Sequence, residues 1–109
     1  MMKEAEVVRA LAALAQSLRL RVFRLLVVAG QEGLTPGAIA EELEVPAATL
    51  SFHLKDLMNS GLVTQERDGR HLIYRASFGH MNQLLGYLTS NCCQGEPRSV
   101  EADASCGCS

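Results

Sequence analysis

The sequence predicts a mainly α-helical domain with one small β-hairpin, in the order helix, helix, helix, tight turn, helix, hairpin, helix. Three observations support this fold class. Apolar residues recur every three or four positions over most of residues 7–58 and again over residues 81–88, which is the spacing of one helix face. The periodicity changes over residues 62–76, where Asp68-Gly69 separates two short runs and is a strong signal for a hairpin turn. Glycine and proline stand where helices are expected to begin or end.

The composition fits one ordinary globular domain followed by a tail. The chain has 109 residues, enough for one modest core, and its longest apolar run, residues 25–29, is far too short to cross a bilayer. We expect a folded domain over residues 1–93 and a flexible tail over residues 94–109, because the tail has almost no large apolar residues. The first residues lack the basic-then-apolar pattern of a signal peptide. We therefore expect a cytoplasmic protein that does not contact a membrane.

Two helices are expected at the start of the domain. One face of the first helix carries the apolar residues Val7, Val8, Leu11 and Leu14. The second helix is expected from Ser17 to Ala29, with Ser17 as its N-cap and Gly30 as its C-terminal stop. Its apolar side is formed by Leu18, Val22, Leu25 and Leu26.

The next two helices are expected to form a helix-turn-helix. Thr35 is a good N-cap and Pro36 suits the first helical position, so a short helix is predicted to run to about Leu43. The segment Glu44-Val45-Pro46 makes a tight break. A new helix then runs from Pro46 to about Ser60 and ends at Gly61.

A hairpin is expected to follow the helix-turn-helix as a wing. Its predicted strands are Leu62–Arg67 and His71–Ala76, with Asp68-Gly69 between them. A last helix is expected from Phe78 to Asn91. The predicted architecture is thus a winged helix-turn-helix.

The helix that starts at Pro46 is expected to have a buried face and a free face. Leu50, Leu54, Leu57 and Met58 share one side, and a helix with a free opposite side can enter the major groove of double-stranded DNA. The net charge of −2 does not by itself indicate nucleic-acid binding, so this prediction depends on the local arrangement. Arginines at the tip of the wing can enter a minor groove. The candidate DNA-binding residues are Ala48, Thr49, Ser51, Phe52, His53, Lys55, Arg67 and Arg70. His53 lies at the edge of the buried face, where a structural role is equally well supported.

All four cysteines lie in the last 18 residues: Cys92, Cys93, Cys106 and Cys108. In a reducing cytoplasm such a cluster indicates a metal or redox site rather than a structural disulfide framework. Four thiolates can hold zinc or cadmium, although Cys-Cys and Cys-Gly-Cys are not the usual zinc spacing. A thiol redox switch between the pair and the tail is a further alternative.

Several of these stretches resemble the ArsR/SmtB family of metal-responsive repressors. The similarity lies in residues 50–57, in Gly61-Leu62-Val63, and in residues 67–70 with Tyr74, and residues 14–26 resemble the second helix of that family. It extends over about residues 7–93. The resemblance implies a homodimer on an operator with half-sites about one helical turn apart. In this family the first and last helices form the dimer interface, which implicates Val7, Leu11, Leu14, Met81, Leu85 and Leu88.

The resemblance also implies a signal. Two sensing sites of the family are not matched, because residues 39–45 hold no cysteine and the last helix has His80 without acidic partners. The chain instead resembles an arsenite-responsive branch with a vicinal cysteine pair after the last helix. Soft trivalent arsenic, or antimony, binds thiolates. Cys92 and Cys93 would supply two ligands and Cys106 or Cys108 the third.

The sequence does not favour an enzyme. A cysteine nucleophile needs a base that the fold holds beside it, usually a histidine. The three histidines, His53, His71 and His80, are predicted on the DNA-contacting helix, the wing and the last helix. The sequence has no Gly-rich phosphate loop and no organic cofactor is expected.

Overall fold

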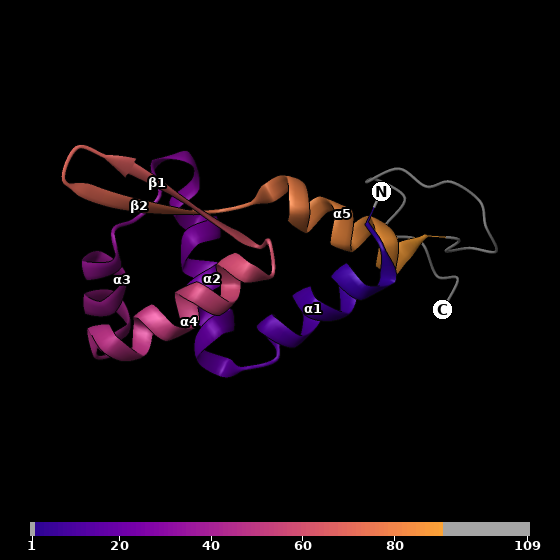
Figure 1. Ribbon diagram of the computed structural model, residues 1–109, viewed down its shortest axis with the longest axis horizontal. Helices are drawn as coiled ribbons and strands as arrows, with labels where there is room; N and C mark the ends of the chain where they lie inside the picture. The colour runs from indigo at the N-terminus through magenta and orange to yellow at the C-terminus, as the bar shows by residue number, and fades with distance from the viewer. Residues whose placement is uncertain (1, 91–109) are drawn as a thin grey trace.

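The computed structural model describes residues 2–90, and these residues form the predicted winged helix-turn-helix (Figure 1). The wing, α3 and α4 lie toward one end of an elongated molecule, and α1 and α5 extend toward the other (Figure 1). The elements are α1 (Glu4–Leu14), α2 (Ser17–Ala29), the 3-10 turn η1 (Gly30–Glu32), α3 (Pro36–Leu43), α4 (Ala47–Asn59), β1 (Val63–Asp68), β2 (His71–Ala76) and α5 (Phe78–Thr89). None of the helices in this range is long and apolar enough to cross a membrane.

The start of α2 differs from the prediction. Ser17 is already helical, and the N-cap is Gln16, whose backbone is extended (φ −134°, ψ 129°). The side-chain Oε1 of Gln16 accepts a hydrogen bond from the backbone N–H of Arg19 over 3.0 Å. It thereby satisfies one of the donors that a helix start leaves free. The predicted stop at Gly30 is confirmed, with φ at 66°.

The helix-turn-helix follows its local signals closely. Thr35 caps α3 by accepting a hydrogen bond from the Ala38 N–H over 3.2 Å, and Pro36 is the first helical residue. Glu44 ends α3 in the left-handed region, with φ at 55°, and Pro46 is the N-cap of α4. The chain leaves α4 through Ser60, whose buried hydroxyl donates to the Leu57 carbonyl over 2.7 Å.

The wing is antiparallel, with Val63 opposite Ala76 at its base and Asp68 opposite His71 near its tip. Asp68 was predicted in the turn, but it is the last residue of β1, because the two-residue loop is formed by Gly69 and Arg70. Positive φ at Gly69 (64°) suits such a tight loop. Leu34 pairs with Tyr74 on the other side of β2 and ties the wing to the segment before α3.

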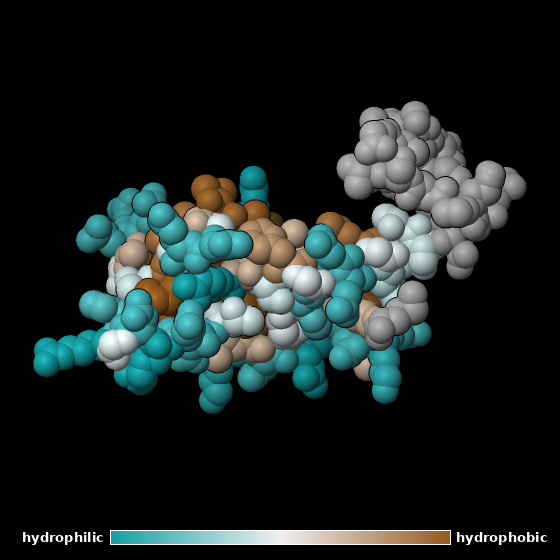
Figure 2. All heavy atoms as spheres, turned by 90° about the horizontal axis from the view of Figure 1, so that it is seen from above, coloured by the Kyte–Doolittle hydropathy of each residue, from teal (hydrophilic) through white to brown (hydrophobic). Residues whose placement is uncertain are grey.

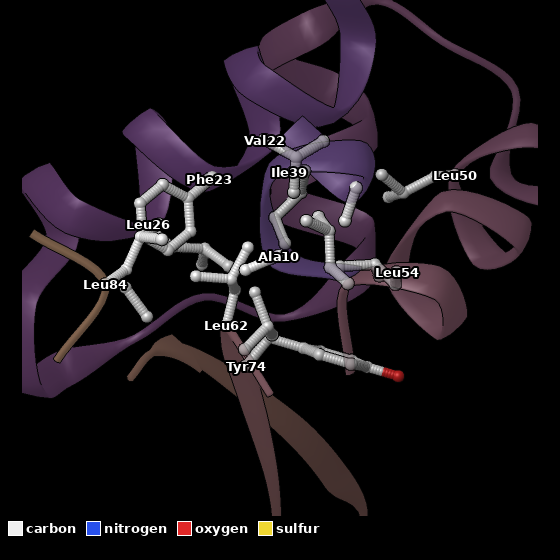
Figure 3. Packing of buried hydrophobic residues seen from close by; sticks show 14 of the residues in the cluster. Ala10, Val22, Phe23, Leu26, Ile39, Leu50, Leu54, Leu62, Tyr74 and Leu84 are labelled. Carbon is white, nitrogen blue, oxygen red and sulfur yellow. The ribbon is translucent and has the colours of Figure 1, made fainter. Parts of the chain in front are cut away.

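The core lies where α2, α3, α4 and the base of the wing converge, and it also takes in residues of α1 and α5 such as Ala10 and Leu84 (Figure 3). Its largest fully buried side chains are Leu26, Ile39, Leu50, Leu54, Leu57, Leu62 and Val22. Burial of an apolar side chain of this size contributes about 1.5–3 kcal/mol. The inner face of α4 and the start of β1 are therefore held in the core, whereas the outer face of α4 and the wing tip lie outside it.

Candidate nucleic-acid interface

The two faces of α4 are those that the sequence predicts. Leu50, Leu54 and Leu57 are at most 2% exposed, and Met58 is half-buried against them. The predicted contact residues on the other side are exposed: Ala48, Thr49, Ser51, Phe52 and Lys55. This surface combines small residues, hydroxyls and one cation, which permits close approach to DNA and hydrogen bonds to bases or phosphates.

Phe52 is the large apolar residue on that free face, and its side chain is 65% exposed. Its ring makes an edge-on contact with His53, with the ring centroids 5.9 Å apart. Hydrophobic residues on the surface seen in Figure 2 are confined to small patches among hydrophilic ones. An exposed ring beside hydroxyl groups and a lysine can contact a thymine methyl in the major groove.

His53 is tied to another helix rather than free. Its Nδ1 accepts a hydrogen bond from Arg19 Nε of α2 over 3.2 Å. The same guanidinium donates from Nη2 to Asp56 Oδ2 over 2.6 Å. The roles of Arg19 and Asp56 could not be predicted, because the two residues are 37 positions apart and no local pattern joins them.

The arginines of the wing divide into two groups. Arg67 and Arg70 are exposed near the tip and form no ion pair with any residue between 2 and 90. Arg75, nearer the base, donates from Nη1 to Glu66 Oε1 and from Nε to the Gln31 carbonyl, each over 2.6 Å. Arg75 therefore fastens the wing to the segment after α2, whereas the tip arginines are available to a ligand.

The helices α1 and α5 lie side by side at the end of the molecule away from the wing (Figure 1). Of the residues predicted to form a dimer interface, Leu11, Leu85 and Leu88 are exposed at 42%, 51% and 52%. Leu14 and Met81 are half-buried. Val7 was placed in the interface, but it is only 3% exposed because it packs in the core of its own chain. The neighbouring Val8, at 57%, points outward instead.

His80 packs inside the chain rather than on an open surface. Its ring borders a hollow of about 310 Å³ that is also lined by Glu6 and Arg9 of α1 and by Asn59 at the end of α4. Its Nε2 is buried without a hydrogen-bond partner among the residues described. No group of three or more His, Cys, Asp or Glu side chains within residues 2–90 is placed to hold a metal ion. The predicted ligands Cys92, Cys93, Cys106 and Cys108 lie outside the described residues.

Comparison with known proteins agrees with this architecture. A family model described as a helix-turn-helix domain matches residues 14–66. The HTH-type transcriptional repressor SmtB of Mycobacterium tuberculosis is 38% identical over 47 residues, which are 43% of this chain. The matched segment spans only 35% of that repressor's length.

Solved structures extend the similarity over most of the described chain. An ArsR-like transcriptional regulator from Rhodococcus is 28% identical, with a TM-score of 0.70 over 77% of this chain and 76% of its own. The homodimeric winged helix-turn-helix DNA-binding domain of Mb0332 from Mycobacterium bovis, a possible ArsR-family regulator, is 27% identical, with a TM-score of 0.65 over 78% and 83%.

A possible transcriptional regulator for arsenical resistance is 30% identical, with a TM-score of 0.64 over 72% of this chain and 79% of its own. All four proteins are named as transcriptional regulators or as a domain of one. This agrees with the prediction that the chain is not an enzyme.

Proposed function

The chain belongs to the ArsR/SmtB family of transcriptional regulators, and on that premise we propose that it is a cytoplasmic, dimeric repressor that trivalent arsenic releases from its operator. The observation that carries the DNA-binding part is the division of α4 into a core-packed face and an exposed face with Thr49, Ser51 and Lys55. Arg67 and Arg70 at the wing tip add two exposed cations. Together they offer contacts to the bases and to the phosphate backbone.

Dimerisation is supported by the apolar surface on α1 and α5. Val8, Leu11, Leu85 and Leu88 are each more than two-fifths exposed, although they lie on helices that pack together. Association of two such surfaces removes apolar area from water. The similar domain from Mycobacterium bovis is homodimeric. In a dimer, two copies of α4 would enter successive major grooves, about 34–36 Å apart.

The proposed sensing site is formed by cysteines alone. Residues 2–90 contain no cysteine, so a soft thiophilic ion is expected to bind Cys92, Cys93 and one of Cys106 and Cys108. The helix α5 ends at Thr89, and only Ser90 and Asn91 separate it from the vicinal pair in the sequence. The regulator named for arsenical resistance supports arsenic as the signal. Because α5 carries Leu85 and Leu88, a ligand bound after it is well placed to alter the proposed dimer interface.

The size of the response can be estimated from coupling free energies. If the binding of the effector and the binding of DNA disfavour each other by a coupling free energy of about 1–3 kcal/mol, the effector lowers the affinity for DNA by roughly 5–150-fold. Binding of the ion to thiols also releases protons. Both quantities can be measured on the full-length chain.

The test is fluorescence anisotropy with a labelled duplex from the DNA that precedes the protein's own gene. The chain is kept reduced and titrated separately with arsenite, zinc and cadmium, and a separate sample is titrated with a thiol oxidant. Release by arsenite alone, and its loss in Cys92→Ser or Cys93→Ser, supports the proposal. Release by zinc or cadmium would indicate a four-thiolate metal site, and release only by an oxidant would indicate a redox switch. Failure of the reduced chain to bind the duplex would overturn the repressor assignment.

Cys106→Ser and Cys108→Ser identify the third ligand. If one of the two distal thiols completes the site, only that variant loses the arsenite response. If each single variant retains the response and the double variant loses it, the two distal thiols substitute for each other. A Cys106→Ser/Cys108→Ser double variant that still responds to arsenite would contradict the three-thiolate site.

A further inference from the structure

Three side chains from two helices meet along the edge of α4 that faces α2. Arg19 of α2 donates to His53 Nδ1 over 3.2 Å and to Asp56 Oδ2 over 2.6 Å. His53 and Asp56 are three positions apart on α4, so their side chains are neighbours on the helix surface. The guanidinium of Arg19 therefore contacts two residues that lie about one turn apart on the same edge of α4.

The contact with Arg19 selects one tautomer of the His53 ring. An arginine has donors only, so Nδ1 of His53 must present its lone pair, and the ring proton is then on Nε2. Nε2 has no hydrogen-bond partner among residues 2–90 and is not one of their buried polar atoms. His53 is consequently left with an N–H donor that is not fully buried and has no partner among residues 2–90.

The position of His53 on α4 indicates what this donor can contact. Phe52 and Lys55 are exposed on the outer face, whereas His53 is half-buried and lies between that face and α2. A residue at the middle of the outer face of a helix in the major groove meets base edges. A residue at its border meets the wall of the groove, which is the phosphate backbone.

Because Asp56 is acidic and lies beside His53, a phosphate contact at His53 requires the ion pair between Asp56 and Arg19. Asp56 is the one acidic residue of α4, and its side chain is 36% exposed beside His53. An unpaired carboxylate there would repel a phosphate approaching His53. The 2.6 Å pair with Arg19 neutralises it. A partly exposed ion pair adds little to folding stability, so stability alone is a weak reason for this arrangement.

We propose that Arg19 is a positioning residue for DNA binding, which holds the His53 ring with its Nε2–H toward an operator phosphate and neutralises Asp56 beside it. The inference rests on the proposed role of α4 in binding DNA. It adds a contact to the phosphate backbone that depends on α2, through a residue for which no DNA contact of its own is proposed.

The first experiment is ¹⁵N NMR of the histidine rings in the labelled full-length chain without DNA. His53 is expected to carry its proton on Nε2 in the wild type and to lose this preference in Arg19→Met. Arg21→Met is the matched control, because Arg21 is an exposed arginine two residues further along α2 and forms no hydrogen bond with His53. A wild-type ring with its proton on Nδ1 would overturn the proposal.

The second experiment measures affinity for the operator duplex and for a shuffled duplex of equal length. A hydrogen bond to a charged group contributes about 1.5–3 kcal/mol, so Arg19→Met is expected to weaken binding to both duplexes about tenfold or more. His53→Phe should do the same without changing the salt dependence, because a neutral donor displaces no counterion. Adding Asp56→Asn to Arg19→Met should recover part of the loss.

Three results would contradict the proposal. The first is equal affinity of Arg19→Met and Arg21→Met for DNA. The second is a loss of affinity confined to the operator duplex, which would indicate a base contact. The third is no recovery of affinity when Asp56→Asn is added to Arg19→Met. If the wild type binds neither duplex, the proposed function fails instead. The NMR experiment without DNA then still tests the Arg19–His53 contact by itself.

Discussion

Gly61 lies against the imidazole ring of His80, so closely that a β-carbon at Gly61 would stand 2.8 Å from both Cε1 and Nε2 of the ring. Gly61 also has a φ of 86°, in the region that favours glycine. It follows directly after Ser60, the C-cap of α4, and His80 lies in the first turn of α5. The end of the proposed DNA-binding helix and the start of the proposed dimerisation helix are therefore in direct contact.

Gly61→Ala is expected to destabilise the fold. The added methyl group meets the His80 ring, and the backbone conformation is strained for alanine, so the free energy of unfolding should fall by about 1–3 kcal/mol. Urea denaturation at fixed protein concentration measures it. Gly37→Ala in α3 is the control, because no atom lies within 4 Å of its β-carbon position, and it should leave stability unchanged or raise it. Equal stability of the two variants would mean that the His80 ring moves aside freely.

The elements with strong local signals could be predicted from the sequence. Thr35-Pro36 and Asp68-Gly69 determine backbone conformation through their own chemistry, and both mark the element boundaries in the structure to within one residue. The Gln16 N-cap could not be predicted, because the adjacent Ser17 is a commoner capping residue. The longer side chain of Gln16 caps α2 only because the local geometry brings its oxygen to the start of the helix.

Contacts between distant segments could not be predicted. Periodicity shows that α1 has an apolar face, but it does not decide whether Val7 or Val8 turns toward the core, because adjacent residues differ by only about 100° around a helix. The link from Arg19 to His53 spans 34 positions and has no sequence signal. The pairing of Leu34 with Tyr74 depends on how η1 places the chain beside β2.

Two residues on opposite faces of α4, Phe52 and Leu54, should separate folding from DNA binding. Leu54 is 2% exposed, and Leu54→Ala should lower the free energy of unfolding by about 2–5 kcal/mol, as a buried leucine truncation does. Phe52 is 65% exposed, so Phe52→Ala should leave stability within about 0.5 kcal/mol of the wild type and weaken operator binding. Denaturation and anisotropy on both variants check this. A large loss of stability in Phe52→Ala would mean that the ring packs in the chain or its dimer rather than against DNA.

The wing arginines should act through charge. Arg67→Ala and Arg70→Ala are each expected to weaken binding to operator and shuffled duplexes alike and to reduce the slope of log affinity against log salt by about 1. Anisotropy across a salt series measures the slope. Arg24→Ala, an exposed arginine of α2 on another part of the surface, is the matched control and should preserve it. If the slope is unchanged in both wing variants, the wing tip does not contact phosphates.

Leu88→Glu should disrupt the proposed dimer. Leu88 is 52% exposed near the end of α5, and a carboxylate at this position would have to be desolvated when two copies associate, which is costly without a partner. Val28→Glu is the control, because Val28 is 82% exposed on α2 and lies outside the predicted interface. Sedimentation should show monomers for Leu88→Glu and dimers for Val28→Glu at the same concentration. Operator affinity should fall only in Leu88→Glu, because a monomer binds one half-site. A dimeric Leu88→Glu would exclude the end of α5 from the interface, and a monomeric Val28→Glu would place the interface on α2.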